Sequence, residues 1–313
     1  MPLNDLRKVR AVSRPLDRPS RPKARRRFGA AGLFGFSVLL LTGCTEDLKR
    51  GFLPKGVTGN SDDITFFWNA TWLWALAVGV LVWGLMFWAM VRYRAKKGDK
   101  TLPPQMQYNV PLEILYTVVP VFMVAVLFGK TVELEDKMLD TSQKPDVTVN
   151  VVGKQWSWDF NYIEAKAYDT GVQAELTGKR GVEKTLPTMY LPVNKRVEFV
   201  LTARDVIHSF WVPQFLQKLD MMPGRVNKFQ ITTTETGTFT GKCAELCGAY
   251  HSEMLFQVKV VPQNEYDKKM KQLRDAGQSG FLSNSLDRSG LIKQQQQYLP
   301  PGLRESDAKE LSK

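Results

Sequence analysis

Histidine and cysteine are scarce in this chain. Its 313 residues include two His and three Cys, and the segment 243–254 (CAELCGAYHSEM) holds one of the His and two of the Cys, together with a Met. The second His is His208. Few other imidazoles or thiols remain to compete for a metal, so a site with soft ligands must involve this segment. Thiolate, imidazole and thioether together are the donors that suit copper.

Positive charge is not evenly distributed along the chain. Residues 1–27 carry ten Lys or Arg against Asp5 and Asp17, and residues 28–43 carry no charge. Setting residues 1–43 aside leaves 33 basic and 29 acidic residues, so the formal charge falls from +12 to +4. Most of the basicity therefore belongs to a targeting segment, and the case for a nucleic-acid partner loses its main support.

The first 43 residues have the form of a signal peptide. A basic region precedes the apolar run 28–41, which is short for a membrane span but has the length of a signal-peptide core. The run ends in Leu41-Thr42-Gly43-Cys44, which resembles the bacterial lipobox, whose Cys is lipid-modified and becomes the new N-terminus. The alternative is a buried Cys near the end of a short anchor. Residues 44–63 are expected to form an exposed linker.

One long stretch, Ile64–Val91, lacks charge altogether and exceeds the roughly 20 apolar residues that a transmembrane helix needs. A basic loop follows, which the positive-inside rule places in the cytoplasm. A second apolar stretch returns across the membrane, so 64–132 is predicted to be a two-helix transmembrane hairpin. Glu113 lies near the cytoplasmic start of the second helix, where an ionisable group is costly unless paired or hydrated. The alternative for Glu113 is an interfacial side chain that reaches water.

Residues 146–261 change to short segments rich in β-branched and aromatic residues, punctuated by Gly and Pro. This pattern predicts an all-β sandwich. Seven strands are expected, at 146–152, 155–162, 196–203, 207–212, 225–233, 237–241 and 254–261. The insertion 163–186 is expected to be a surface excursion, and 262–313 to form a solvated helix followed by a tail.

Three kinds of site compete for the segment 243–254 with His208. Two nearby Cys outside the cytoplasm form a disulfide by default. A structural zinc site would suit the Cys and His ligands but not their spacing. Copper, held by a loop between sandwich strands, suits the added Met. A mononuclear blue-copper loop has one Cys, whereas two thiolates can bridge two copper ions.

The segment resembles the binuclear CuA motif of cytochrome c oxidase subunit II, C-x-E-x-C-x3-H-x2-M, and matches it at every defined position. The stretches 206–213 and 218–225 resemble the family's first His strand and the turn after it. The similarity covers roughly 64–261. It implies a cupredoxin-like CuA domain on the extracytoplasmic side of the bacterial cell membrane, joined to the hairpin.

The resemblance assigns a role to each matching residue. Cys243 and Cys247 would bridge two coppers, His208 and His251 would be terminal ligands, and Met254 would be a weak ligand. The backbone carbonyl of Glu245 would complete the set. The side chain of Glu245 would also contact a magnesium ion shared with subunit I.

Two further residues take roles from the family. Trp156 in Gly153-Lys154-Gln155-Trp156-Ser157-Trp158 would face the electron donor, although Ser157 stands where Tyr is common. Glu113 would lie at the mouth of a proton channel in subunit I. The expected donor is cytochrome c, and the hypothesis for its form is a membrane-bound cytochrome c that contacts 163–186.

The implied function is that of the electron-accepting subunit of a terminal oxidase. It would take electrons from cytochrome c and pass them to haem in subunit I, where oxygen is reduced and protons are pumped. Both His are used as copper ligands, so catalysis belongs to the partner. The alternatives are of three kinds. One is a quinol oxidase subunit II, which lacks the copper ligands. The others are a nitrous oxide reductase and a copper chaperone or storage lipoprotein.

Overall fold

The computed structural model describes residues 45–95, 98, 102, 105–174 and 185–282. The predicted signal peptide and Cys44, residues 175–184 of the 163–186 insertion and the tail after residue 282 lie outside this range.

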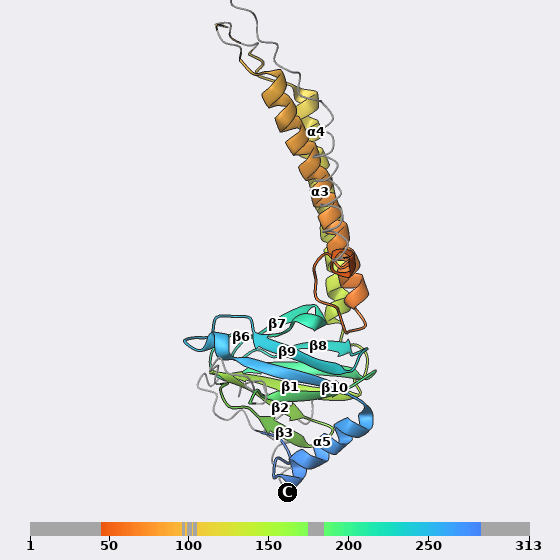
Figure 1. The fold of residues 1–313 in the computed structure, drawn as a ribbon, viewed down its shortest axis with the longest axis vertical. Helices are drawn as coiled ribbons and strands as arrows, with labels where there is room; N and C mark the ends of the chain where they lie inside the picture. The colour runs from red at the N-terminus through yellow and green to blue at the C-terminus, as the bar shows by residue number, and fades with distance from the viewer. Residues whose placement is uncertain (1–44, 96–97, 99–101, 103–104, 175–184, 283–313) are drawn as a thin grey trace, which may run out of the picture. The chain divides into compact units, whose positions relative to one another are not determined.

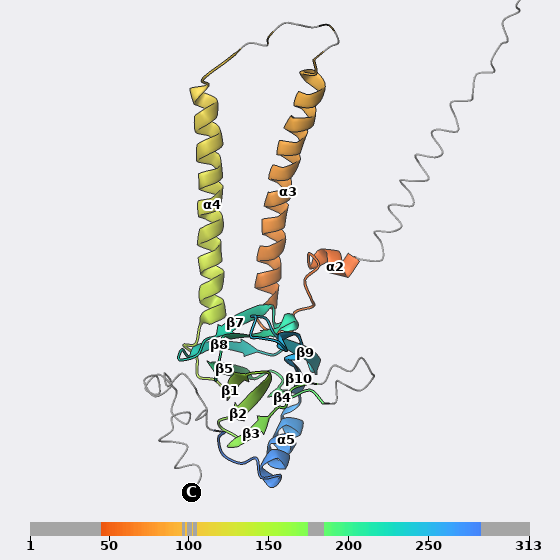
Figure 2. The same ribbon diagram turned by 90° about the vertical axis from the view of Figure 1, so that its left-hand side faces the viewer.

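Two long apolar helices form the membrane part. Helix α3 spans Ser61–Arg92 and α4 spans Val110–Leu139, and both are long and apolar enough to cross a bilayer. They run side by side in Figure 2. Pro120 lies inside α4. Because almost every side chain of the two helices is exposed in the isolated chain, their apolar surface is available to lipid or to other subunits. The predicted two-helix architecture is confirmed.

Two five-stranded sheets form the sandwich seen in layers in Figure 1. In the first sheet the order is β3 (Ala167–Thr170), β2 (Ser157–Tyr162), β1 (Val147–Lys154), β5 (Arg196–Ala203) and β8 (Asn227–Thr232). In the second it is β4 (Thr188–Pro192), β10 (Leu255–Val261), β9 (Gly237–Cys243), β6 (His208–Val212) and β7 (Gln217–Met221). Neighbours are antiparallel except for β1 with β5 and β10 with β4. The predicted all-β sandwich is confirmed.

Aromatic rings fill the space between the sheets. Phe210 stacks on Phe256 with ring centroids 5.2 Å apart, and Trp158 packs against Phe256 at 4.9 Å. These rings are almost completely buried. Packing of this kind fixes the distance between the two sheets and therefore the positions of the loops at their ends.

Three strands were missed by the sequence prediction: β3, β4 and β7. Strand β3 corrects the expectation that 163–186 is wholly a surface excursion, because it pairs with β2 and Ala167 is completely buried. Strand β7 reads QKLDM, and its charges hide the strand pattern. Its position is decided by pairing with β6.

The predicted linker and C-terminal helix also differ from expectation. Val57 is buried and Thr58 forms a β-bridge with Thr233, so the end of the linker packs on the β domain. Helix α5 (Gln263–Asp275) is not simply solvated, because Tyr266, Met270 and Leu273 are buried on one face. Their spacing is that of an amphipathic helix. The short helix α2 spans Thr45–Lys49.

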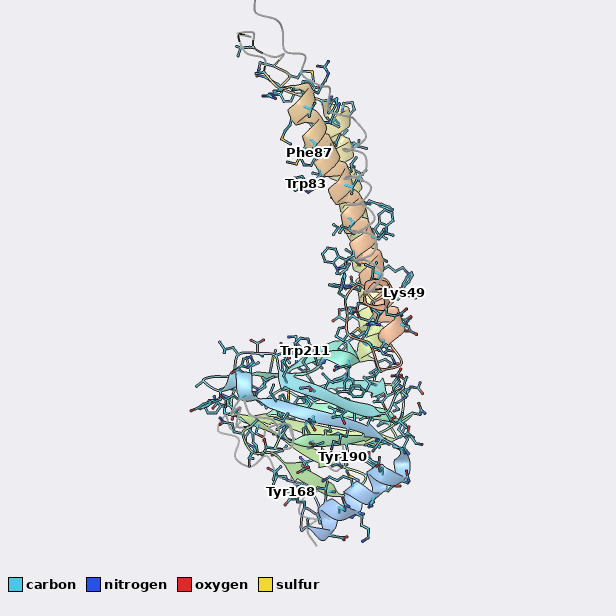
Figure 3. All side chains as sticks on the ribbon, viewed as in Figure 1. Lys49, Trp83, Phe87, Tyr168, Tyr190 and Trp211 are labelled. Carbon is cyan, nitrogen blue, oxygen red and sulfur yellow. The ribbon has the colours of Figure 1, made fainter. Side chains whose placement is uncertain are left out.

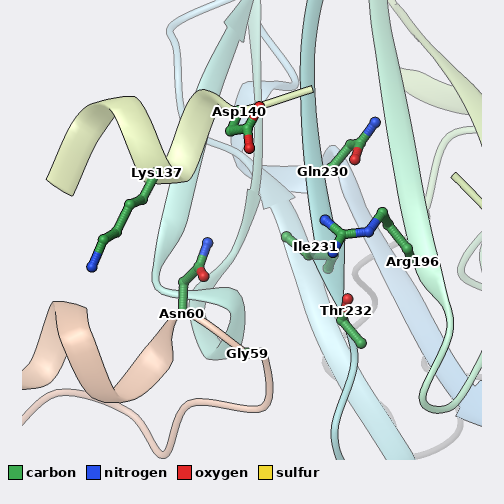
Figure 4. Close-up of a pocket in the computed structure, with 8 residues that line it drawn as sticks. All are labelled: Gly59, Asn60, Lys137, Asp140, Arg196, Gln230, Ile231 and Thr232. Carbon is green, nitrogen blue, oxygen red and sulfur yellow. The ribbon is translucent and has the colours of Figure 1, made fainter. Parts of the chain in front are cut away.

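A polar hollow of about 330 Å³ lies between the start of α3, the end of α4 and strands β5 and β8 (Figure 4). Asn60, Asp140, Arg196 and Gln230 are among its lining residues. Lys137 at its rim forms an ion pair of 3.2 Å with Asp63 across the two helices. The hollow is separate from the His and Cys residues described next.

Candidate metal centre

Strand pairing brings His208 and Cys243 together. His208 begins β6 and Cys243 ends β9, and these antiparallel strands pair Phe210 with Cys243. Residues two apart in a strand share a face, so His208 projects from the same face as Phe210. The segment 244–254 then returns to β10, and the Cys243 amide donates to the Met254 carbonyl at 3.0 Å. This bond closes the loop at its base.

The two thiols face each other inside this loop. Cys243 Sγ lies 3.9 Å from Cys247 Sγ. A disulfide requires a sulfur–sulfur distance of about 2.05 Å, so both thiols are free. The distance is short enough for one metal to contact both sulfurs, because metal–thiolate bonds are about 2.3 Å long.

Four further donor atoms surround the two sulfurs. The Glu245 carbonyl oxygen lies 3.2 Å from Cys243 Sγ, and His208 Nδ1 lies 3.9 Å from it. His251 Nδ1 and Met254 Sδ lie 3.6 Å and 3.7 Å from Cys247 Sγ. A tetrahedral zinc site needs neither the thioether nor the carbonyl, whereas copper binds both thioether and thiolate well. The donor set therefore fits copper better than zinc.

Burial and mutual repulsion separate the pKa values of the two thiols. For Cys243, burial alone would raise the pKa, but hydrogen bonds from His208 and from backbone amides lower it to about 7. For Cys247, burial and the neighbouring Cys243 raise the pKa to about 12. Without a cation the pair releases one proton readily and the second with difficulty, because two adjacent thiolates repel each other. A bound metal cation would favour both thiolates.

Asp205 fixes the orientation of His208. Its Oδ1 lies 2.8 Å from His208 Nε2, and its Oδ2 accepts from the Gln155 amide at 2.7 Å. With Nε2 directed at this carboxylate, Nδ1 is left facing Cys243. Carboxylate partners of this kind hold metal-binding imidazoles in one tautomer and orientation. Gly153 makes room for the ring, because a Cβ there would lie 3.0 Å from His208 Cδ2.

Trp156 is hydrogen-bonded directly to the segment 243–254. Its indole Nε1 donates to the Cys247 carbonyl at 3.2 Å, and Gln155 Nε2 donates to the same oxygen at 2.9 Å. The neighbouring Ser157 is buried and donates to the Val172 carbonyl at 2.8 Å. A small residue at Ser157 therefore leaves space for the first part of the insertion.

Glu113 lies in the membrane hairpin, remote from the candidate ligands. Its Oε1 accepts from the Asn109 amide at 3.0 Å, while Asn109 Oδ1 accepts from the Leu112 amide at 3.3 Å. This reciprocal pattern caps the start of α4. The sequence suggested that Glu113 is either an interfacial side chain or a residue at the mouth of a proton channel. Helix capping is a further role that the sequence did not suggest.

Sequence reasoning gave no role to Asp205 and Gln155, which contact the candidate centre, or to Tyr250, whose ring contacts Trp156. Asp205 precedes His208 by three residues, and Tyr250 directly precedes His251. Proximity to a candidate ligand was the available signal, but it does not indicate which way a side chain points.

Comparison with known proteins identifies the family. A family model described as cytochrome c oxidase subunit II, periplasmic domain, matches residues 147–261. A second, described as the transmembrane domain of the same subunit, matches residues 48–129. The chain belongs to the cytochrome c oxidase subunit II family. The two matched domains correspond to the β sandwich and the helical hairpin.

Relatives in this subunit II family align over most of their length. The probable cytochrome c oxidase subunit 2 of Streptomyces avermitilis is 46% identical over 297 residues, which cover 85% of this chain and 92% of that protein. Cytochrome c oxidase subunit 2 of Mycobacterium tuberculosis is 35% identical over 300 residues, which cover 80% and 82%. The crystal structure of the periplasmic domain of subunit II of cytochrome oxidase of Bradyrhizobium japonicum is 33% identical, covers 43% of this chain and 97% of that one, and has a TM-score of 0.39.

Proposed function

We propose that this chain is the electron-accepting subunit of a haem–copper terminal oxidase, and that His208 and the segment 243–254 hold a binuclear CuA centre. The observation that carries the proposal is the convergence of two free thiols, two imidazole Nδ1 atoms, a thioether and a carbonyl, five of them from the segment 243–254 and one from His208 on β6. Membership of the subunit II family supports copper as the metal. Cytochrome c is the donor, and haem in subunit I is the acceptor.

In this proposal Cys243 and Cys247 would hold both coppers as thiolates, and His208 and His251 would bind through Nδ1. Met254 and the Glu245 carbonyl complete the set. Bound copper supplies a one-electron acceptor. The protein contributes rigidity, because His208 and Met254 are completely buried and the loop base is closed by hydrogen bonds. Ligands that cannot move keep the geometry similar in both redox states, which favours fast electron transfer.

Trp156 is the proposed electron input residue. Its hydrogen bond to the Cys247 carbonyl links a half-buried indole to a copper ligand without an intervening side chain. The Glu245 side chain is exposed. Exposure is required of a side chain that contacts a magnesium ion shared with subunit I. Glu113 would serve the proton channel from the start of α4, where it also caps the helix.

The outer membrane surface is proposed to lie near Trp68 and Asn69 of α3, and Cys44 to carry a lipid there. Asn69 Nδ2 donates to the Lys49 carbonyl at 2.7 Å, and Trp68 Nε1 donates to the Gly51 carbonyl at 2.9 Å. Trp is typical of the membrane interface. Cys44 is five positions before Lys49 in the chain, a reach of at most about 18 Å. A lipid on Cys44 is therefore compatible with the way the chain is held at α3.

An EPR spectrum of the copper-loaded, air-oxidised complex tests the centre. We expect a mixed-valence signal with hyperfine coupling to two equivalent copper nuclei. His208→Ala should abolish the signal, whereas Glu113→Gln should leave it intact and slow oxygen turnover. A signal from a single type-2 copper in the wild type would refute the binuclear centre. Purification without a haem-containing partner would instead favour a copper-storage lipoprotein.

A further inference from the structure

Apolar exposure on the β domain is concentrated around the metal-binding segment. In the described part of the chain after residue 139, the exposed large hydrophobic side chains are Val172, Ile207, Leu246 and Tyr250. Ile207 adjoins His208, Leu246 and Tyr250 belong to 243–254, and the Val172 carbonyl accepts from Ser157 next to Trp156. Contiguous exposed apolar surface marks an interaction site, and of these four side chains Tyr250 is the one whose ring contacts Trp156.

Tyr250 is joined to Trp156 within this group. The two rings meet edge to face, with centroids 4.9 Å apart and planes inclined at 74°. Tyr250 is 45% exposed, whereas Trp156 is half-buried. A partner that approaches Trp156 from solvent therefore meets the Tyr250 ring beside it.

The backbone holds Tyr250 in this position. Its carbonyl accepts from the Glu253 amide at 3.0 Å, and the His251 amide donates to the Gly248 carbonyl at 3.2 Å. Gly248 has a φ of +123°, and a Cβ there would lie 3.1 Å from Trp156 Cζ2. The indole thus lies against the Gly248 backbone and the Tyr250 ring, both supplied by the loop that carries the candidate copper ligands.

We propose that Tyr250, beside the electron input residue Trp156, extends the contact surface for the exposed haem edge of the donor cytochrome c. The inference rests on the proposed function. One electron leaves the ferrous donor haem, which becomes ferric, and reduces the copper pair by one electron; no bond forms or breaks. Trp156 supplies the bonded route to Cys247, and Tyr250 supplies apolar contact area and keeps the indole in place.

An apolar haem edge suits this surface better than a partner recognised by charge. Residues 146–261 carry 13 Lys or Arg and 12 Asp or Glu, so the domain offers little net field for steering. Aromatic side chains provide contact area at low entropic cost and dominate many interfaces. Tyr250 also lies beside Trp156, where a redox partner must approach to reach Cys247 through the indole.

The test measures electron transfer in the purified oxidase complex by stopped flow, with reduced cytochrome c and, separately, hexaammineruthenium(II). Tyr250→Ala should slow reduction by cytochrome c about two- to tenfold, the range expected for loss of an aromatic pair. It should leave reduction by the small complex unchanged. Tyr250→Phe should keep the wild-type rate, because the ring makes the contact. Tyr250→Leu replaces Tyr250→Ala if the alanine complex does not assemble.

Tyr190→Ala is the matched control. Tyr190 is a partly exposed Tyr on β4, labelled in Figure 3. Its ring contacts Lys259 and Lys269 instead of the segment 243–254. It should change neither rate. Unchanged cytochrome c kinetics in Tyr250→Ala, or equal slowing with both reductants, would overturn the inference. The EPR spectrum separates this outcome from failure of the proposed function, because a wild type without the mixed-valence signal refutes the centre regardless of Tyr250.

Discussion

Replacing Asp159 with Asn should destabilise the β domain by about 3–5 kcal/mol, the usual cost of breaking a buried ion pair from one side. The Asp159 side chain is completely buried, and its Oδ1 accepts from Lys154 Nζ at 2.6 Å and from Thr170 Oγ1 at 2.7 Å. Its Oδ2 accepts from Arg204 Nη2 at 2.9 Å. The carboxylate thus joins β1, β2, β3 and the end of β5.

The magnitude follows from burial. The side chains of Lys154 and Arg204 are 19% and 13% exposed, so water cannot compensate them once the carboxylate charge is lost. An Asn amide can accept from one cation, but its NH2 group would face the other. The exposed pair of Lys55 and Glu235 has side-chain exposures of 64% and 46%. Glu235→Gln should therefore cost at most about 1 kcal/mol and is the matched control.

Pulse proteolysis of the full chain in detergent, across a urea series, measures the effect on the β domain. With a urea dependence of about 2 kcal/mol per molar, the Asp159→Asn midpoint should fall by about 1.5–2.5 M, and the Glu235→Gln midpoint by no more than about 0.5 M. Equal shifts in the two variants would refute the reasoning from burial. Lys154 precedes Gln155, and Arg204 precedes Asp205, so the loss should also loosen the support of the metal centre.

Three further predictions concern single side chains. Asp205→Asn should weaken copper binding about 10–100-fold, because His208 loses its carboxylate partner; competition with a copper chelator measures this, and unchanged affinity contradicts it. Ser157→Tyr should destabilise the domain by about 1–3 kcal/mol, because the buried Ser157 packs against Gly171; the urea midpoint again reports it, and an unchanged midpoint argues against tight packing there. Burial raises the pKa of Asp169, although the nearby Lys269 opposes this shift. The contribution of Asp169 to the stability of the fold is therefore complete below the ordinary Asp pKa, and it is lost as the pH rises through the higher pKa of the folded state. Asp169→Asn should consequently raise the unfolding temperature at pH 7 and lose this advantage in acid, whereas a gain independent of pH would exclude the titration as its cause.

Much of the fold could be predicted because its signals are local. A stretch without charge that exceeds the bilayer thickness indicates a membrane helix whatever surrounds it. Segments of β-branched and aromatic residues that alternate with polar residues indicated the long buried strands in the same way. The short strands β3 and β7 carry charged residues and are defined by their partners, β2 and β6, so local sequence did not indicate them.

The sequence by itself determined the chemistry that is available: two thiols, two imidazoles and a thioether, with four of these five donors confined to 243–254. Only the tertiary structure decided their arrangement. His208 is 35 residues from Cys243, and pairing of β6 with β9 brings it to the thiol. Trp156 is 91 residues from Cys247, and packing of the two sheets brings its indole to the carbonyl. The physical reason is that donor types are properties of single residues, whereas distances between strands follow from hydrogen-bond register and core packing along the whole chain.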